Sequence, residues 1–420
     1  MITKKTILIL GAGANTHLGY PLGQNLIQDI CRFPFAKSIG RLKKNTSAGT
    51  ETLQTDADHA ELLEIFLSQA DIDKKFKFSR DNIMTFSKEL FKAQPTSIDF
   101  FLEKNPQYAI LGKLCIIFCL SKYEDDNSWL YAPWNSPEKF FVSFPEFGWY
   151  RYLWNKMIEG CEGRGTEGME NLKANKISIL TFNYDRSLEH YLMRAITSFF
   201  NVSIEEAAGV FDSIKIKHVY GALGEFDWQR NRRVNSSADT GSFVESATQD
   251  TKPFRPWEIS TFFRLKGDLR LSSLPGGTSN IYGVTKDDLI ASPDDRQKQR
   301  TGLLNRFLKA TEDIRLFHEV LSAKKHAEFY ADIALAEKVY FLGFGYHSLN
   351  IKALGFSGER SSVGGKIFGT AIDLSTLEVL VKKHSFFNSP QNVDIRNDWI
   401  GLEKSDCKIT SFFRHVAPLE

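Results

Sequence analysis

Apolar runs alternate along the chain with amphipathic segments, which predicts strands and helices in turn. Ile7–Leu10 is an uninterrupted apolar run stopped by Gly11, as expected of a strand buried on both faces of a parallel sheet. Similar patterns predict strands at Ile177–Phe182, Lys215–Tyr220, Val339–Gly345 and Lys366–Leu374, with short strands or edges at Val393–Ile395 and Ile409–Phe412.

Helical spacing of apolar residues separates these strands. It predicts helices at Leu22–Phe33, Glu61–Gln69, Asn82–Lys92, Tyr108–Lys122, Trp149–Ile158, Arg186–Phe200 and Leu377–Lys383, with two more between Gln299 and Lys338. The alternation indicates an α/β fold, a Rossmann-like parallel sheet flanked by helices. We expect the α/β domain at 1–33 and 173–385, a mostly helical insertion at 34–172 after the first βα unit, and a C-terminal extension at 386–420.

Polar or glycine-rich turns follow several of the expected strands. In an open α/β sheet, ligands bind in a crevice outside the carboxyl ends of the strands. Segments far apart in sequence are therefore expected to meet on one rim. These segments are Gly11–Asn15, Asn183–Asp185, Tyr220–Gly221 and Gly343–His347.

The first turn carries an incomplete dinucleotide fingerprint. Gly11 and Gly13 match G-x-G-x-x-G, but the sixth position is Thr16 and the next glycine is Gly19. Two interpretations remain open at this point. The turn either presents backbone N–H groups to a phosphate or is a tight βα turn with no ligand.

Composition narrows the partners and the compartment. The 420 residues are 42% hydrophobic and 25% charged, with a net charge of +2 that gives no support for a polyanion. The basic cluster 229–233 is better explained as a solvated loop than as a nucleic-acid patch. There is no secretory signal and no apolar run of membrane-spanning length, so we expect a cytoplasmic protein with no membrane partner. The five cysteines lack metal-site spacing, so we expect reduced thiols and no structural zinc.

Asn183 and His218 are the main candidates for chemistry on the rim. The Asn183 amide could hold a ribose hydroxyl or orient water, or it could cap the next helix, a role that suits Asp185 equally. His218 is either a general base or a satisfied core histidine, and on an extended strand it points the same way as Tyr220. Tyr220 is a weak base at neutral pH.

Three further polar residues lie close to these positions. Glu189 is four residues after Asp185 and is either part of the site or an exposed surface carboxylate. His347 and Asn350 follow the glycines of the fourth strand. They either contact a ribose or adenine or begin the next helix.

Four motifs in order carry a resemblance to a known family. They are Gly11-Ala-Gly-Ala-Asn15 with Gly19-Tyr-Pro21, Thr181-Phe-Asn-Tyr-Asp185, His218-Val-Tyr-Gly221 and Phe341-Leu-Gly-Phe-Gly345. Together they resemble sirtuin-like domains, most closely the bacterial antiphage-defence branch that lacks the zinc module.

The resemblance implies an NAD site on a Rossmann-like domain without zinc. Gly11, Ala12 and Gly13 would line the pyrophosphate, and Gly343 and Gly345 would contact the adenosine side. Asn183 and Asp185 would lie by the nicotinamide ribose. Asn15, Gly19 and Gly221 belong to the same implied NAD-binding set, while Asn183, Asp185, His218 and Tyr220 form the implied catalytic set.

In the defence branch the resemblance implies an NAD+ hydrolase that depletes NAD and stops an infected cell from growing. A homo-oligomer is expected, with a HerA-type ATPase or a short Argonaute-type protein as partner. The aromatic stretch Trp129–Trp154 is the expected contact surface. Two positions depart from the family: Asn15 stands where Ser is usual, and the usual His-Gly pair is Tyr220-Gly221, with His218 two residues earlier.

Three alternatives stay open beside the hydrolase. A protein deacylase conflicts with the missing zinc ligands and the altered histidine position. A non-catalytic NAD- or ADP-ribose-binding scaffold is suggested by Tyr220. A dehydrogenase lacks the acidic residue expected after a second strand to bind the adenine ribose.

Overall fold

The structure is a computed structural model, and it describes about half of the chain. The described residues are 1–32, 80–126, 148–163, 165–224, 226, 228–229, 310–316, 319–320, 325–355, 366–370, 377–378, 381, 409–415 and 417–420.

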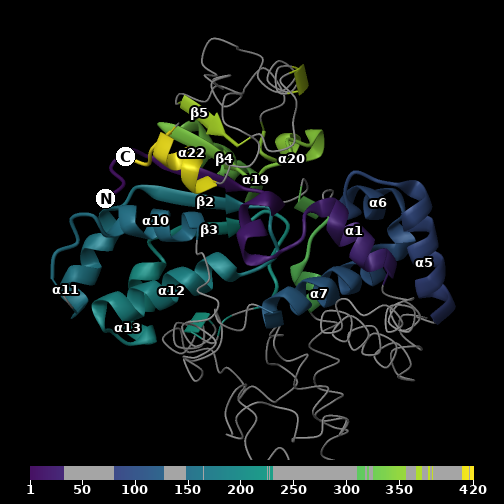
Figure 1. Cartoon of the computed structure of the whole chain (residues 1–420), viewed down its shortest axis with the longest axis horizontal. Helices are drawn as coiled ribbons and strands as arrows, with labels where there is room; N and C mark the ends of the chain where they lie inside the picture. Colours follow the sequence, from purple (N-terminus) through teal and green to yellow (C-terminus); the bar gives the residue numbers. More distant parts are fainter. Residues whose placement is uncertain are drawn as a thin grey trace, which may run out of the picture. The chain divides into compact units, whose positions relative to one another are not determined.

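Five parallel strands form one sheet (Figure 1). They are β1 (Thr6–Leu10), β2 (Ile177–Thr181), β3 (Lys215–His218), β4 (Lys338–Leu342) and β5 (Lys366–Gly369). Every residue of β1 and β4 is buried, as expected of central strands covered on both faces. The edge strand β3 has no fully buried residue. The α/β class and the parallel sheet expected from the apolar runs are thus confirmed.

The strand order is β3-β2-β1-β4-β5, so the chain changes direction between β1 and β4. Leu10 lies beside Thr181 of β2 and Leu342 of β4, which brings three strand ends level with one another. The divergence of neighbouring connections at such a switch point leaves a crevice at the carboxyl ends of the strands. This part of the sheet corresponds to the rim expected from the sequence.

Helices flank the sheet on both faces. The helix α12 (Ser187–Phe200) lies in the connection from β2 to β3, and α20 (Ser348–Ala353) lies in that from β4 to β5 (Figure 1). These connections run in opposite directions across the sheet, so the right-handed rule predicts the two helices on opposite faces. The remaining helices with the sheet are η1 (Ala12–Leu18), α10 (Gly148–Ile158), α11 (Gly165–Glu170), η4 (Asn171–Ala174), α13 (Ile204–Phe211), α19 (Lys325–Ala334) and α22 (Ile409–His415).

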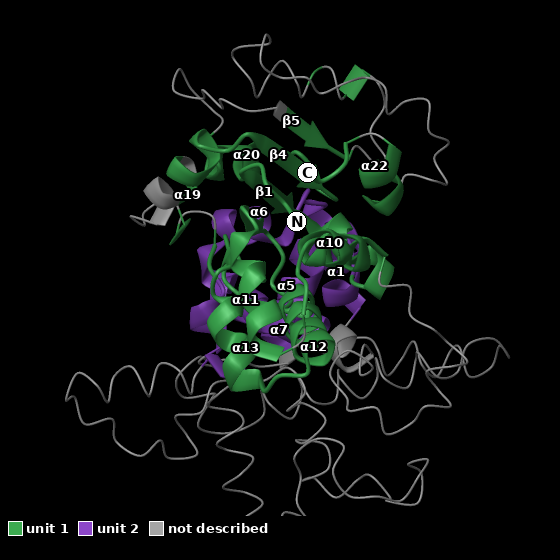
Figure 2. Ribbon diagram, turned by 90° about the vertical axis from the view of Figure 1, so that its left-hand side faces the viewer, with its two compact units in different colours: residues 1–20, 138–222, 315–420 green, residues 21–137, 223–314 purple. Residues whose placement is uncertain are grey.

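The chain divides into two compact units (Figure 2). Unit 1 comprises 1–20, 138–222 and 315–420 and contains the sheet; unit 2 comprises 21–137 and 223–314. These limits differ from the boundaries expected from the sequence. The helix after the first strand belongs to unit 2, whereas α10 and α11 of the expected insertion belong to unit 1.

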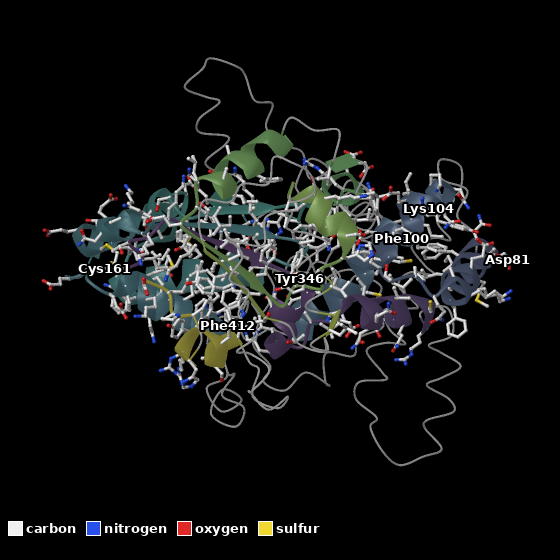
Figure 3. The ribbon with its side chains drawn as sticks, turned by 90° about the horizontal axis from the view of Figure 1, so that it is seen from above. Asp81, Phe100, Lys104, Cys161, Tyr346 and Phe412 are labelled. Atoms are coloured by element: carbon white, nitrogen blue, oxygen red, sulfur yellow. The ribbon has the colours of Figure 1, made fainter. Side chains whose placement is uncertain are left out.

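Unit 2 is helical where it is described. It contains α1 (Gly23–Arg32), α5 (Arg80–Ala93), α6 (Ile98–Lys104), η3 (Pro106–Tyr108) and α7 (Ala109–Asp126). The α7 residues from Leu114 to Leu120 are all buried, and Phe86 and Phe101 pack with their ring centroids 6.1 Å apart. On the surface of α6, the Lys104 ammonium lies 5.9 Å from the Phe100 ring (Figure 3). None of the helices described is both long and apolar enough to cross a membrane.

Two element predictions were wrong. The strand expected at Lys215–Tyr220 ends at His218, and Tyr220 lies in a turn, so the argument that both side chains share a face does not apply. The edge expected at Ile409–Phe412 is the helix α22, whose Phe412 and Phe413 are buried (Figure 3). The elements expected at 61–69 and 393–395, and the basic cluster from residue 230 onward, lie outside the described residues.

Candidate functional site

The loops after β1 and β4 touch through their glycines. The Gly13 N–H donates to the Gly343 carbonyl oxygen at 2.9 Å, and the Gly11 N–H donates to the Leu342 carbonyl oxygen at 3.0 Å. A Cβ on Gly11 would lie 2.6 Å from the Gly343 oxygen, and one on Gly13 would lie 2.9 Å from the same oxygen. The glycines at the switch point are therefore required by this backbone contact, whether or not a ligand lies above it.

A 3-10 helix, η1, follows the first glycine turn directly. Gly11 is its N-cap, Ala12 begins it, and Gly19 ends it with a left-handed φ of 84°. The polar segment expected between the strand and α1 therefore has a regular structure. It points Asn15, which is buried, toward the loop that follows β2.

Asn15 and Asp185 join the loops after β1 and β2 in a buried polar cluster. Asn15 Nδ2 donates to both Asp185 carboxylate oxygens, at 2.9 and 2.7 Å. Tyr150 from α10 donates to Asn15 Oδ1 at 2.9 Å, and its hydroxyl oxygen lies 2.8 Å from Ser187 Oγ. The Ser187 backbone N–H and hydroxyl both donate to Asp185 Oδ1.

Burial raises the pKa of the Asp185 carboxyl, and the hydrogen bonds from Ser187 and Asn15 oppose this rise. Asp185 also accepts the Ser187 N–H at the start of α12, but the N-cap of that helix is Arg186, so neither Asp185 nor Asn183 is its N-cap. Since Asn15 and Asp185 bond to each other, their side chains fix the two loops. Sequence reasoning missed Tyr150 and Ser187, because neither carries a motif.

Replacing Tyr150 by Phe is expected to destabilise unit 1. The change removes the hydroxyl that bonds to Asn15 and Ser187 in a buried cluster, and leaving such groups without this partner costs about 2 kcal/mol. Thermal or urea unfolding measures the effect. Tyr152→Phe is the control, because the Tyr152 hydroxyl makes a single long bond of 3.4 Å to the Phe413 carbonyl oxygen. Equal losses for the two variants would contradict the role of the cluster.

Asn183 lies at the carboxyl end of β2 and is 8% exposed. Its backbone N–H donates to Thr181 Oγ1 at 3.0 Å, which turns the chain away from the strand. Among the described residues, none forms a hydrogen bond with its side-chain nitrogen Nδ2. A buried amide donor without a partner is costly, and such groups often mark functional sites.

His218 contacts two groups, one through each ring nitrogen. Its Nδ1 lies 2.8 Å from the Asn183 carbonyl oxygen, and its Nε2 lies 2.7 Å from Glu189 Oε1 on α12. Arg186 Nε donates to the same Glu189 oxygen at 2.8 Å. The exposed-carboxylate interpretation of Glu189 was wrong, since the residue is 3% exposed.

The carboxylate of Glu189 is the centre of this ionic cluster. Burial alone would raise its pKa, but the Arg186 guanidinium and the His218 ring lower the pKa to about 2. Glu189 is thus ionised at neutral pH and accepts from both neighbours. Arg186 was not predicted as a site residue, although its position three residues before Glu189 is the spacing of a helical ion pair.

Tyr220 lies in the turn after β3, next to Gly221, whose φ is 82°. Its hydroxyl donates to Asn350 Oδ1 on α20 at 2.7 Å. Its ring packs edge-on against Phe182, with the centroids 5.5 Å apart, and Phe182 packs in the same way on Phe344 at 5.1 Å. Asn350 is therefore a partner of Tyr220, and the loops after β2, β3 and β4 meet through these rings.

The loop after β4 is tightly constrained up to the start of α20. Gly343 and Tyr346 have left-handed φ values of 57° and 49°, an uncommon conformation for a tyrosine. Tyr346 (Figure 3) is 7% exposed, and its hydroxyl occupies the space that a Cβ on Gly369 would need. His347 is the N-cap of α20 and accepts the Leu349 N–H, which is the helix-starting role that the sequence left open.

The four segments expected on one rim do meet there. Asn15 bonds to Asp185, Gly13 to Gly343, and Asn183 to His218, while Tyr220 contacts Phe182 and Asn350. Trp149, from the aromatic stretch expected as a contact surface, is buried beneath this rim, since it is 2% exposed and donates to the Ala14 carbonyl oxygen at 2.8 Å. Residues 129–147 of that stretch lie outside the described residues.

The fold and this rim define an α/β protein with a Rossmann-like parallel sheet and a polar site at its switch point. Comparisons with protein-family models, with curated proteins and with solved structures find no match for the chain. Within the described residues, no group of three or more His, Cys, Asp or Glu side chains could hold a metal ion.

Proposed function

We propose that the protein is an NAD+ hydrolase that cleaves the bond between nicotinamide and ribose. The observation that carries the proposal is the buried Asn183 amide, which has no hydrogen-bond partner among the described residues and lies beside the switch point of a Rossmann-like sheet. The order of the four sirtuin-like motifs supports the same ligand. Dinucleotides bind at such switch points in open α/β sheets.

The reaction needs little from the protein in the way of acid catalysis. The ring nitrogen of bound nicotinamide is cationic, so the electron pair of the breaking bond neutralises it and nicotinamide leaves without taking up a proton. Water adds to the ribose carbon and releases one proton to solvent. The products are nicotinamide, ADP-ribose and a proton, and the Asn183 amide would hold the ribose or the attacking water as positive charge develops on the sugar.

Side chains that already bond to other protein groups are not available to the reaction. Asn15 and Asp185 bond to one another, and the Tyr220 hydroxyl donates to Asn350. Asn183 is then the candidate whose polar atom is available, and the other residues support the loops that hold it. The glycines of the β1 and β4 loops would bring the backbone close to the pyrophosphate and the adenosine side.

Incubation of purified protein with NAD+, followed by chromatography, tests the proposal. Release of nicotinamide and ADP-ribose in equal amounts supports hydrolysis. Because the resemblance implies a partner, the assay also includes a genomic neighbour. NAD+ that stays intact under every condition, with a folded protein, would rule hydrolysis out.

Replacing Asn183 by Ala or Asp is expected to lower kcat by about 100-fold, the usual cost of losing one aligned polar group at a developing charge. Asp has almost the shape of Asn but lacks the NH2 donor, so both variants should lose activity. For Asn183→Ala, KM and the unfolding midpoint should change little, since Nδ2 has no partner to lose among the described residues. Asn82→Ala, on the exposed surface of α5, is the matched control.

A second candidate is a binding module that does no chemistry. The observation in its favour is that the Tyr220 hydroxyl and both His218 nitrogens already have protein partners, which leaves no general base among the residues expected to supply one. Tight NAD+ binding by calorimetry, with the nucleotide unchanged after long incubation, would favour it. Release of nicotinamide that strictly requires an acyl-lysine peptide would favour a deacylase.

The biological setting proposed with the hydrolase is antiphage defence by abortive infection. NAD+ depletion would follow activation by homo-oligomerisation or by a HerA-type ATPase or short Argonaute-type partner. Infection of cells carrying the intact or the Asn183→Ala protein, with NAD+ measured over time, tests this setting. Equal NAD+ levels in the two strains would contradict it.

A further inference from the structure

The His218 ring has acceptors on both sides. A carbonyl oxygen can only accept, so the contact between Nδ1 and the Asn183 oxygen requires hydrogen on Nδ1. Glu189 is an ionised carboxylate that also accepts from Arg186, so the contact at Nε2 requires hydrogen on Nε2. With both contacts made, each ring nitrogen faces a protein acceptor and neither faces a substrate.

The two contacts link α12 to the loop after β2. Arg186 and Glu189 lie at the start of α12, and His218 is the last residue of β3. The chain of bonds runs from Arg186 through Glu189 and His218 to the backbone of Asn183. These hydrogen bonds hold the backbone of Asn183, and its side chain is attached at that point.

We infer that His218 is a positioning residue, which acts with Glu189 and Arg186 to hold Asn183 in place and does not serve as the general base. The inference rests on the proposed function, because it assigns His218 a role toward the residue proposed to bind the reacting sugar. It also changes the role of His218, which the sequence placed among the catalytic residues. The ion pair between Arg186 and Glu189, through His218, supports the carbonyl group of Asn183 at the end of β2.

Two substitutions separate the two bonds that His218 makes. In Asn, the side-chain nitrogen can take the place of Nδ1, so His218→Asn keeps a donor toward the Asn183 carbonyl and loses the bond to Glu189. In Gln, the nitrogen can take the place of Nε2, so His218→Gln keeps the donor toward Glu189 and loses the bond to Asn183. Neither side chain acts as a base near neutral pH.

If His218 positions Asn183, His218→Asn retains kcat within about 5-fold of wild type and His218→Gln loses at least 10-fold, with KM little changed in both. In the Asn183→Ala background, His218→Gln should cause little further loss, because a residue that acts through Asn183 has nothing left to position. Equal large losses for the two variants, or a full additional loss in the Asn183→Ala background, would overturn the inference in favour of a base.

A spectroscopic measurement tests the inference without any catalysis. The NH2 signal of Asn183 in a spectrum of 15N-asparagine-labelled protein is identified by its absence in Asn183→Ala. It should keep its position in His218→Asn and move in His218→Gln. If wild type cleaves no NAD+ but this pattern appears, the proposed function fails and the positioning role stands; a signal that moves equally in both variants, or in neither, refutes the positioning role.

Discussion

Alanine at Gly343 is expected to unfold unit 1 or to destabilise it by about 4 kcal/mol or more, the range reached by the most damaging single substitutions. A Cβ at this position would overlap the Ala14 nitrogen and the Gly13 carbonyl carbon, and it would lie 2.7 Å from the Gly13 Cα. All three are backbone atoms of the neighbouring loop, so no side-chain rotation relieves the overlap. The left-handed φ of 57° adds strain of about 1 kcal/mol or more.

Gly345→Ala is the matched control, two residues further along the same loop. Nothing lies within 4 Å of a Cβ at Gly345, so this variant should unfold close to the wild-type midpoint. Circular dichroism during urea or thermal unfolding gives both midpoints. If Gly343→Ala unfolded together with Gly345→Ala and wild type, the contact between the β1 and β4 loops would not be what requires glycine there.

The sheet could be predicted because its central strands are buried on both faces. Continuous apolar runs such as Ile7–Leu10, followed by glycine, are typical of strands buried on both faces, and their alternation with helical segments fits a parallel sheet. The end of β3 was misplaced because Val219 and Tyr220 continue the strand-like composition into a turn. Ile409–Phe412 was misread because a short apolar run does not distinguish a strand from a buried helix.

The rim of the site was predicted for a geometric reason, but its hydrogen bonds were not. Parallel strands place their carboxyl ends together, so residues as distant as Asn15 and Asp185 were expected on one edge. Which of them would bond to one another depends on side-chain directions that no sequence pattern records. Tyr150 shows this best: it completes the cluster from α10, which was assigned to the insertion and not to the α/β domain.

The contacts of the glycines likewise could not be predicted from the sequence. Gly11, Gly13 and Gly343 were chosen as ligand contacts, and the structure adds a second reason for each, namely the backbone of the facing loop. A glycine fingerprint at a switch point can thus reflect close packing of two loops as well as a nucleotide. The Asn183 amide, whose nitrogen has no hydrogen-bond partner among the described residues, is a stronger indication of a ligand, because packing alone gives no reason to bury it.

Replacing Glu189 by Gln is expected to cost about 3–5 kcal/mol at neutral pH, because the change removes the buried carboxylate that Arg186 and His218 both face. Glu205→Gln is the control: it removes the same charge from an exposed position on the nearby helix α13 and should have little effect. Urea unfolding of the two variants beside wild type measures the difference.

The cost of Glu189→Gln should depend on pH in a defined direction. The folded pKa of Glu189 is lowered from 4.5 to about 2, so folding favours the ionised form, and the stability linked to it is fully present above about pH 4.5. That stability, about 3 kcal/mol, is lost as the pH falls toward 2, because the Glu189 carboxyl takes up its proton at a higher pH in the unfolded chain than in the folded one. The difference between wild type and Glu189→Gln should therefore narrow from pH 5 to pH 2.5. The neighbouring ionisable groups are Arg186, His218 and Asp185, and the charge of Glu189 contributes to the raised pKa of Asp185. A difference that stays constant over this range would show that Arg186 and His218 do not hold the carboxylate in the ionised form.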